Sequence, residues 1–446
     1  MKKEECRSQI VGKISAHPNP VPYDHEYVII SWETNDPAGG EVRVSTSAGE
    51  EKLVSRGSSG EAKISWVKAA AVYDFRLYAS SKPGAPIDAI QVTRTSEPTC
   101  PVLQRLATQV LRGEVAPLEL ARFIATVMPH ILKSPKYREI FSLWEQNGFH
   151  VTPVHFYQPI PDTRTLRDML WDQPSKLVGI EMNANAQLDL LRNHFPKFRD
   201  EYEQLPTQPV ENQKRFHLNN GLFDGVDALT AYCMVRYFQP RLIIEVGSGF
   251  SSLILGEAAV KNHKTAIVCI EPYPMAFLRQ GFPWLHELIE ANVQDVNLEF
   301  FSKLGSNDIL FIDSSHTVKV GSDVNYLFLE VLPRLKPGVI VHIHDVFLPF
   351  EYRRDWVIDE LRFWSEQYLL QAFLTFNSEF EVLLANNYLS HYHQAHLKNA
   401  FPFLQDLKTV FTRLRMWQGG SFWMRRKPGA TRPEGNATAI GNPGEI

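Results

Sequence analysis

The chain is poor in cysteine and has none of the segments that mark a membrane protein or a nucleic-acid-binding protein. Its 446 residues include four cysteines without disulfide or zinc-site spacing, so we expect reduced thiols. No apolar run approaches the length of a membrane-spanning helix, and the charged N-terminal stretch lacks the apolar core of a signal peptide. The net charge of −4 comes without a long run of Lys or Arg, which gives a nucleic acid no electrostatic support. We therefore expect a cytoplasmic protein whose partners include neither a membrane nor a nucleic acid.

The first 95 residues differ in pattern from the rest. Short alternating segments are separated by turns rich in Gly, Ser, Asn and Pro, which predicts a β-sandwich over residues 1–95. Residues 28–32, Val-Ile-Ile-Ser-Trp, and residues 73–79, Tyr-Asp-Phe-Arg-Leu-Tyr-Ala, resemble the two most recognisable strands of a fibronectin type III domain. Trp32 is then expected to anchor the core of the sandwich.

Three further segments follow. Residues 96–150 begin with a Pro-containing linker and then show helical spacing of apolar residues, which predicts a helical connector. These helices either join the two larger domains or form the face of a homodimer. Residues 151–426 are long enough for an α/β domain, and residues 427–446 are rich in Gly, Pro, Asn and Thr, which predicts a disordered tail.

The most informative motif begins at residue 242. An apolar strand contains Glu245 and is followed by Gly247 and Gly249, and a helix is predicted from Ser251 to Val260. A second apolar run, 266–270, ends on Glu271. In parallel sheets such short buried strands are joined by helices, and ligands bind beyond their carboxyl ends. The glycines let the backbone approach a ligand closely, and a carboxylate at the next strand end suits ribose hydroxyls, so the pattern predicts a nucleoside-binding crevice.

A second block carries more polar residues at strand ends. The run 308–313 ends on Asp313, and His316 follows three residues later. A helix predicted over 322–335 stops at Lys-Pro-Gly, and the strand 339–343 is followed by His344 and Asp345.

Together these motifs resemble the class I S-adenosylmethionine-dependent methyltransferases, in particular the bacterial O-methyltransferase branch that includes catechol-type and macrolide or rhamnosyl enzymes. The resemblance covers roughly residues 151–426, including His-Phe-Tyr-Gln-Pro-Ile-Pro-Asp at 155–162. The chain departs from the usual motif at Ser251, which replaces its third glycine, and Ser252 replaces the last glycine of a dinucleotide fingerprint, so the fit to NAD is poor. The resemblance implies an α/β fold: a Rossmann-like, doubly wound, mostly parallel seven-stranded sheet, preceded here by the all-β sandwich and the helical connector.

The coarse pattern extends this expectation to the remaining elements. Helices are predicted over 227–237 and 356–368, and strands over 370–376 and 380–385. A last strand over 421–425 is expected at the edge of the sheet.

S-adenosylmethionine is the cofactor that the resemblance implies. The residues expected to bind it are Glu245, Gly247, Ser248, Gly249, Ser251, Glu271, Asn292 and Asp313. Asn292 is either an adenine contact or a turn residue. Asp227 either reaches the aminoacyl end of the cofactor or caps the following helix.

The catalytic residues are expected among Asp313, His316, His344 and Asp345. Methyl transfer to a hydroxyl needs alignment with the methyl carbon and removal of a proton. Relatives hold Mg²⁺ with carboxylates at these strand ends, which implies Asp313 and Asp345 as metal ligands. Because a histidine, His344, stands where such relatives often have an acid, a site with His344 or His316 as general base is the alternative. His342 is expected to be a core residue.

We therefore expect an S-adenosylmethionine-dependent methyltransferase acting on oxygen of a small molecule or a sugar. Two alternatives remain open: a methyltransferase-fold binding or scaffold protein without turnover, and a related hydroxylase-like or NAD-using Rossmann enzyme. Stabilisation by S-adenosylhomocysteine, but not by NAD or ATP, would distinguish them.

Overall fold

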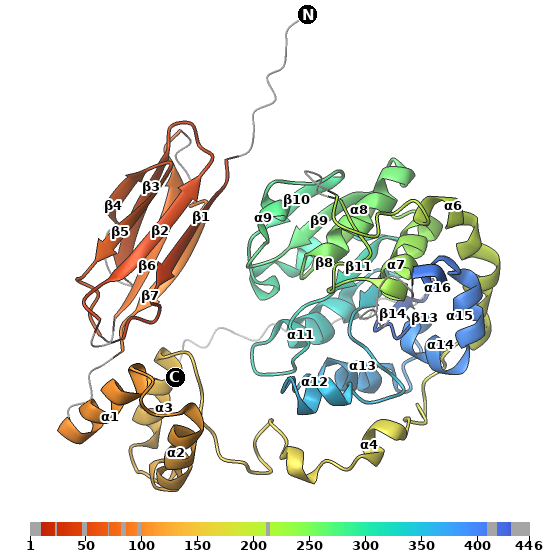
Figure 1. Cartoon of the computed structure of the whole chain (residues 1–446). Coiled ribbons are helices and arrows are strands. Elements are labelled where there is room, and N and C mark those ends of the chain that lie inside the picture. The colour runs from red at the N-terminus through yellow and green to blue at the C-terminus, as the bar shows by residue number, and fades with distance from the viewer. Residues whose placement is uncertain are drawn as a thin grey trace, which may run out of the picture. The chain divides into compact units, whose positions relative to one another are not determined.

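The computed structural model describes residues 10–22, 25–46, 51–69, 71–81, 86–95, 100–210, 215–407 and 417–429. The chain divides into two compact units, Met1–Asp162 and Thr163–Ile446 (Figure 1). The domain limits predicted from the sequence stay predictions, and the predicted tail lies outside the described residues beyond position 429. None of the helices in the described part combines the length and hydropathy of a membrane span.

The first unit contains two antiparallel sheets within its described residues. One sheet has the order β1 (Gly12–His17), β2 (Val28–Thr34), β5 (Ser59–Ile64), and the other has the order β4 (Lys52–Gly57), β3 (Gly40–Thr46), β6 (Val72–Ala79), β7 (Asp88–Thr93). Burial alternates along β2 and β6 because successive side chains point to opposite faces of a sheet. The core role of Trp32 is confirmed: its side chain is buried and its Nε1 donates a hydrogen bond to the Gly57 carbonyl at 3.2 Å. The N-terminal region therefore resembles a fibronectin type III domain in its sheets as in its sequence.

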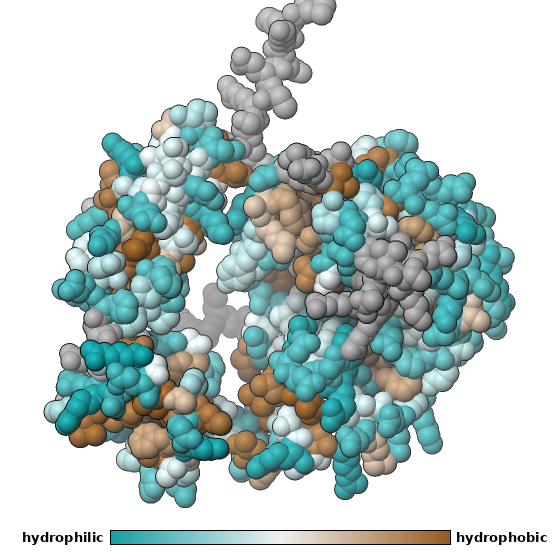
Figure 2. Space-filling model, in the orientation of Figure 1, coloured by the Kyte–Doolittle hydropathy of each residue, from teal (hydrophilic) through white to brown (hydrophobic). Residues whose placement is uncertain are grey.

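Three helices follow the sandwich: α1 (Pro101–Leu111), α2 (Pro117–Leu132) and α3 (Tyr137–Gln146). None of them contains a buried residue. Leu103, Leu118 and Phe123 are all exposed, and Figure 2 shows apolar surface over this segment. The dimer face predicted for these helices stays a prediction.

The second unit is built on a seven-stranded sheet, which confirms the predicted fold class. Its strands, in spatial order, are β10 (Leu285–Ile289), β9 (Ala266–Ile270), β8 (Leu242–Val246), β11 (Ile309–Ile312), β12 (Ile340–Ile343), β14 (Phe422–Arg426) and β13 (Phe380–Ala385). The first five strands are parallel, and β14 is antiparallel to both of its neighbours. Strand β9 has the predicted limits. The carboxyl ends of β8, β9, β11 and β12 therefore meet at one edge, as the motifs require.

Apolar residues cover both faces of this sheet, because every central strand is buried on both sides. Ile243 of β8 packs in a cluster with α7 (Gly225–Phe238) and α8 (Phe250–Asn262), whereas Ile244 packs in a second cluster with α13 (Glu366–Leu374). Figure 1 shows helices on the two sides of the sheet. The other helices of this unit are α4 (Met169–Asp172), α5 (Ala184–Asp189), α6 (Arg199–Tyr202), α9 (Ala276–Arg279), α10 (Leu298–Phe301), α11 (Asp323–Tyr326), α12 (Arg354–Ile358), α14 (Asn386–Tyr392), α15 (Gln394–Ala400) and α16 (Phe403–Leu407).

Three predicted elements need correction. The helix expected over 322–335 is α11 followed by a π-helical turn and a 3-10 turn, because Pro333 has no N–H to continue a regular ladder. The helix expected over 356–368 is replaced by α12 and α13. The strand expected over 370–376 is wrong: Leu370 and Leu374 lie one turn apart on α13, and both are buried. An apolar run of this length fits either period.

The place of the last strand in the sheet is also corrected. Strand β14 forms close to the expected residues, but it lies between β12 and β13, so that β13 is the edge strand. Insertion of β14 between them buries its Trp423 completely.

Candidate active site

One cavity of about 740 Å³ is formed at the carboxyl ends of β8, β9, β11 and β12. Eight of the predicted site residues line it: Gly247, Ser248, Gly249, Ser251, Glu271, Asp313, His344 and Asp345. Glu245, Asn292 and His316 do not line it. The strand-end pattern thus brings most of the predicted residues into one space, because parallel strands end at the same edge of the sheet.

The turn after β8 depends on Gly247. Its φ is +79°, a left-handed conformation, and its N–H donates a hydrogen bond to the Ile270 carbonyl at 3.0 Å. A Cβ atom at this position would lie 1.8 Å from the carbonyl oxygen of Asp313. Only glycine therefore allows the loops after β8 and β11 to touch here.

We expect Gly247→Ala to lower the free energy of unfolding by about 3 kcal/mol, because it combines left-handed strain with a clash against backbone. Gly281→Ala is the matched control: its φ is +78°, but a Cβ there would meet nothing within 4 Å. The control should cost about 1 kcal/mol from strain alone. Urea unfolding without ligand measures both values, and equal losses would contradict the close approach of the two loops.

Glu245 stabilises the conformation of the glycine loop through hydrogen bonds that pass by way of Ser252. It is fully buried, and its Oε2 accepts hydrogen bonds from Ser252 Oγ at 2.5 Å and Cys269 Sγ at 3.3 Å. Ser252 Oγ in turn accepts a hydrogen bond from the N–H of Gly249 at 3.1 Å. Ser252, which stands in place of the last glycine of a dinucleotide fingerprint, thus ties the loop to Glu245 and fixes its shape.

Burial raises the pKa of Glu245 to about 7, from an ordinary value of 4.5. The native protein therefore keeps a proton that the unfolded chain releases, so the contribution of Glu245 to stability is present below about pH 4.5 and is lost as the pH rises to about 7. Relative to Glu245→Gln, the free energy of unfolding of the wild type should fall by about 3 kcal/mol over this window. Urea unfolding at several pH values measures the difference. Glu287→Gln, at an exposed position of β10, is the control. A difference that does not change with pH would contradict the buried acid.

Glu271 is held at the cavity wall by backbone donors. Its Oε2 accepts a hydrogen bond from the N–H of Ser248 at 3.1 Å, and its Oε1 accepts one from the N–H of Tyr273 at 2.8 Å. Asn292, by contrast, is exposed and precedes a 3-10 turn, where its Nδ2 donates to Asp295 at 3.1 Å. Of its two interpretations, the structure favours the turn residue.

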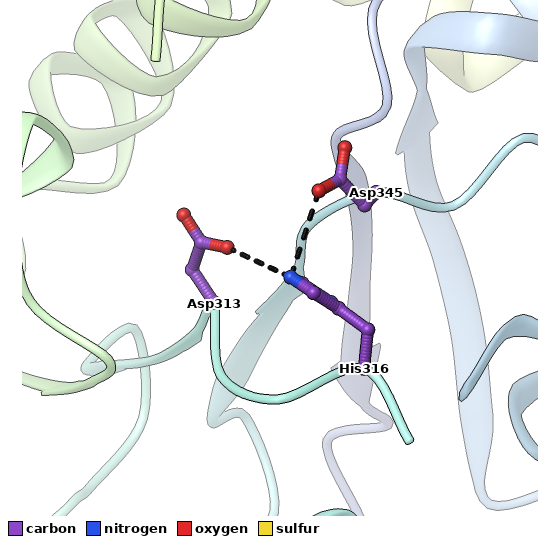
Figure 3. A group of neighbouring side chains, drawn as sticks. All are labelled: Asp313, His316 and Asp345. Carbon is purple, nitrogen blue, oxygen red and sulfur yellow. Dashed lines mark ion pairs between the residues drawn. The ribbon is translucent and has the colours of Figure 1, made fainter. Parts of the chain in front are cut away.

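A cluster of acids and one imidazole occupies the ends of β11 and β12. His316 Nε2 lies 3.4 Å from Asp313 Oδ1 and 3.5 Å from Asp345 Oδ2, and Figure 3 shows the ring directed between the two carboxylates. On its other side, His316 Nδ1 lies 2.9 Å from Glu366 Oε2. One ligand atom each of Asp313, His316 and Asp345 lies within 4.8 Å of the other two. These three residues form a candidate cation site.

A second imidazole extends the cluster toward α7. His344 Nδ1 lies 3.4 Å from Asp313 Oδ1, and its Nε2 lies 3.5 Å from Asp227 Oδ2. Asp227 accepts further hydrogen bonds from the N–H groups of Gly420 and Ser421, both at 2.8 Å. The capping role expected for Asp227 is wrong, because the residue before α7 is Asp224 and Asp227 lies inside the helix.

His342 is a core residue, as predicted. It is completely buried, its ring stacks on Phe311 with centroids 3.8 Å apart, and its Nε2 lies 3.0 Å from Ser421 Oγ. Burial and the charge of His344 hold the pKa of His342 well below its ordinary value, so this ring is neutral.

Attraction between opposite charges shifts the pKa values more than burial does in the acid–imidazole cluster, which consists of Asp227, Asp313, His316, His344, Asp345 and Glu366. Burial disfavours ionised Asp313, but the neighbouring imidazoles of His344 and His316 hold the pKa of Asp313 well below its ordinary value. Burial also disfavours a protonated His316, yet Asp313 and Glu366 raise the pKa of His316 to about 10. Asp345, Asp313 and Asp227 likewise raise the pKa of His344 well above its ordinary value. The carboxylates therefore favour the protonated form of both imidazoles in the absence of a bound cation.

Several residues at this site escaped the sequence reasoning. Asp224 lines the cavity, and burial raises its pKa to about 6; an acid just before a helix was the available signal. Glu366 has no comparable signal, because it is brought to His316 from a distant helix. The cavity wall also includes Arg353, Trp356, Arg362 and Trp364.

Comparison with known proteins identifies one domain. The methyltransferase-domain family profile matches residues 244–346, which contain the glycine loop and the ends of β9, β11 and β12. An uncharacterised protein of Archaeoglobus fulgidus is 37% identical to this chain over 167 residues, which are 35% of this chain and 75% of the relative.

Two solved structures illustrate the structural likenesses. An O-methyltransferase from Bacillus cereus in complex with S-adenosylhomocysteine is 13% identical, with a TM-score of 0.24, and the match covers 55% of this chain and 96% of that one. A human fibronectin type III domain is 26% identical, with a TM-score of 0.16, and the match covers 21% of this chain and 79% of the domain.

Proposed function

We propose, from the premise that this chain belongs to the methyltransferase-domain family, that it transfers the methyl group of S-adenosylmethionine to a hydroxyl oxygen of a small molecule or a sugar. The observation that carries the proposal is the shared cavity: the glycine loop and Glu271 form one part of its wall, and Asp313, His344 and Asp345 form another. The first group suits an adenosyl moiety, and the second provides ionised groups where an acceptor loses its proton.

The cofactor would lie along the first part of the wall. Each oxygen of Glu271 accepts one backbone hydrogen bond and keeps a second lone pair for a ribose hydroxyl. The backbone from Gly247 to Ser251 would approach the ribose and methionine portions, because no side chain intervenes at the glycines. Glu245 acts through the loop, and Asn292 has no part in the proposal because its amide is held by Asp295.

The acid–imidazole cluster fits a divalent cation. Asp313, Asp345 and His316 would hold it, with Glu366 orienting His316 through its other nitrogen. The two imidazoles of this cluster are surrounded by four carboxylates, those of Asp227, Asp313, Asp345 and Glu366. Because the acids outnumber the imidazoles, an additional positive charge is electrostatically favourable. When bound, such a cation supplies Lewis acidity that lowers the pKa of a hydroxyl. Mixed oxygen and nitrogen donors suit Mn²⁺ or Zn²⁺ better than Mg²⁺, which prefers oxygen ligands.

The chain itself supplies alignment. The sulfonium is already activated, so the protein needs to hold the hydroxyl oxygen in line with the methyl carbon. The surrounding carboxylates raise the pKa of His316 and of His344, which favours the protonated form of both rings while no cation is bound and makes neither ring suited to act as the general base. Asp345 lines the cavity beside Asp313. Its carboxylate would either accept the proton of the hydroxyl or help to hold the cation that lowers the pKa of the hydroxyl.

A thermal melting series tests the cofactor. S-adenosylhomocysteine should raise the melting temperature of the full chain, whereas NAD and ATP at the same concentration should not, since binding to the native state alone stabilises it. Stabilisation by NAD in place of S-adenosylhomocysteine would favour the NAD-using alternative. Stabilisation by neither would contradict the proposal.

A further inference from the structure

We propose that the cavity wall formed by residues 353–364 is an anion-binding subsite, so that the methyl acceptor carries a carboxylate or phosphate group in addition to its hydroxyl. This inference rests on the proposed function and names the chemistry of the acceptor. It is carried by two arginines and two tryptophans that line the same cavity as the candidate cation site: Arg353, Trp356, Arg362 and Trp364.

The two tryptophans hold the guanidinium groups in place. Arg353 Cζ lies 4.6 Å from the ring centroid of Trp356. Arg362 Cζ lies 5.0 Å from the centroid of Trp356 and 5.2 Å from that of Trp364. The two indole rings pack edge to face with centroids 5.1 Å apart. Stacked guanidinium groups lose less freedom when they bind a planar anion, which is the usual reason for using arginine at such sites.

Acidic side chains outnumber arginines along the wall of the cavity. Six carboxylates line it: Asp224, Asp227, Glu271, Asp313, Asp345 and Glu360. Arg353 and Arg362 are the only Lys or Arg side chains that line it within the described residues. Because Arg353 and Arg362 lie on the wall formed by residues 353–364, the anionic group of an acceptor would be attracted to that wall, which would leave its uncharged hydroxyl near the strand ends.

The two arginines differ in how firmly their present ion-pair partners hold them, and so in how readily each can bind an anion. Arg362 Nη2 pairs with Glu360 at 2.7 Å, and both side chains are 42% exposed. Such an exposed pair contributes little, so an incoming anion can replace Glu360. Arg353 is more firmly held, since its Nε and Nη2 both bond to Asp355, at 3.1 and 2.5 Å. Arg362 is thus the main anion ligand, and Arg353 adds charge.

The subsite adjoins the acid–imidazole cluster. The ring of Trp364 lies against that of His316, with centroids 4.4 Å apart. A small acceptor can therefore reach the arginines with its anionic group while its hydroxyl lies near Asp313 and Asp345.

The test uses sugars of the same ring type and different charge. Binding of D-glucuronate, D-glucose 6-phosphate and D-glucose to the full chain saturated with S-adenosylhomocysteine is measured by calorimetry at low salt. At least one anionic sugar should bind about tenfold more tightly than glucose, and the preferred one distinguishes a carboxylate from a phosphate. Arg362→Gln should reduce this preference to less than twofold.

Arg354→Gln is the matched control, because Arg354 stacks on Trp171 at 5.6 Å and does not line the cavity. It should keep the preference of the wild type. Equal binding of all three sugars, no binding of either anion, or a preference that survives Arg362→Gln would overturn the subsite. In each of these cases normal S-adenosylhomocysteine binding would leave the proposed function standing, whereas its loss in the wild type would remove both.

Discussion

Asp313→Asn is expected to reduce methyl transfer by at least about 100-fold while S-adenosylhomocysteine still binds. Asparagine keeps the shape of the side chain but removes the charge that faces both His316 and His344. The same change removes one of the three groups that would hold a divalent cation. Turnover of S-adenosyl[methyl-³H]methionine with any hydroxylated acceptor that the wild type uses provides the measurement, and Mn²⁺ binding by calorimetry provides a second readout.

Asp359→Asn is the control for this variant, because Asp359 is exposed at the end of α12 and does not line the cavity. It should keep both activity and cation binding. An Asp313→Asn protein that retains turnover would remove Asp313 from the catalytic group. Loss of cofactor binding together with turnover would show instead that Asp313 acts by supporting the cavity.

Glu271→Ala is expected to weaken S-adenosylhomocysteine binding by roughly 30- to 150-fold, which corresponds to about 2 to 3 kcal/mol. The reason is that the alanine removes a charged acceptor that is already oriented by the N–H groups of Ser248 and Tyr273. Calorimetry measures the dissociation constant directly, and the thermal shift produced by the ligand should disappear in parallel.

Glu287→Ala is the matched control for Glu271→Ala, because Glu287 is an exposed glutamate on the neighbouring strand β10. It should leave the affinity unchanged. An unaltered affinity in Glu271→Ala would contradict the ribose role. A milder loss in Glu271→Gln than in Glu271→Ala would separate the charge of the carboxylate from its hydrogen bonds.

The strand ends were predictable from the sequence because two simple constraints act on them. A strand buried on both faces must be a short apolar run, and the first polar residue after it must lie at the sheet edge. This is why β9 has the predicted limits and why Glu271, Asp313 and Asp345 line one cavity. The glycine loop was predictable for a similar reason, since Gly247 is placed where no other residue fits.

The contacts that surround the strand-end residues were not predictable, because they depend on how distant segments are placed in the tertiary structure. Glu366 meets His316 across fifty positions of sequence. His316 and Asp345 both adopt left-handed backbone conformations, with φ of 56° and 54°, which the sequence pattern does not indicate. The arginine–tryptophan wall lies in an irregular stretch whose helices were misplaced by the pattern. Insertion of β14 between β12 and β13 likewise depends on pairing between distant segments.

A crystal structure of the full chain with S-adenosylhomocysteine tests most directly whether the cofactor and the strand-end residues share one cavity. We predict that both ribose hydroxyls lie within hydrogen-bond distance of Glu271 and that the sulfur is directed at Asp313, His344 and Asp345. A ligand bound outside this cavity, or one whose ribose lies away from Glu271, would contradict it.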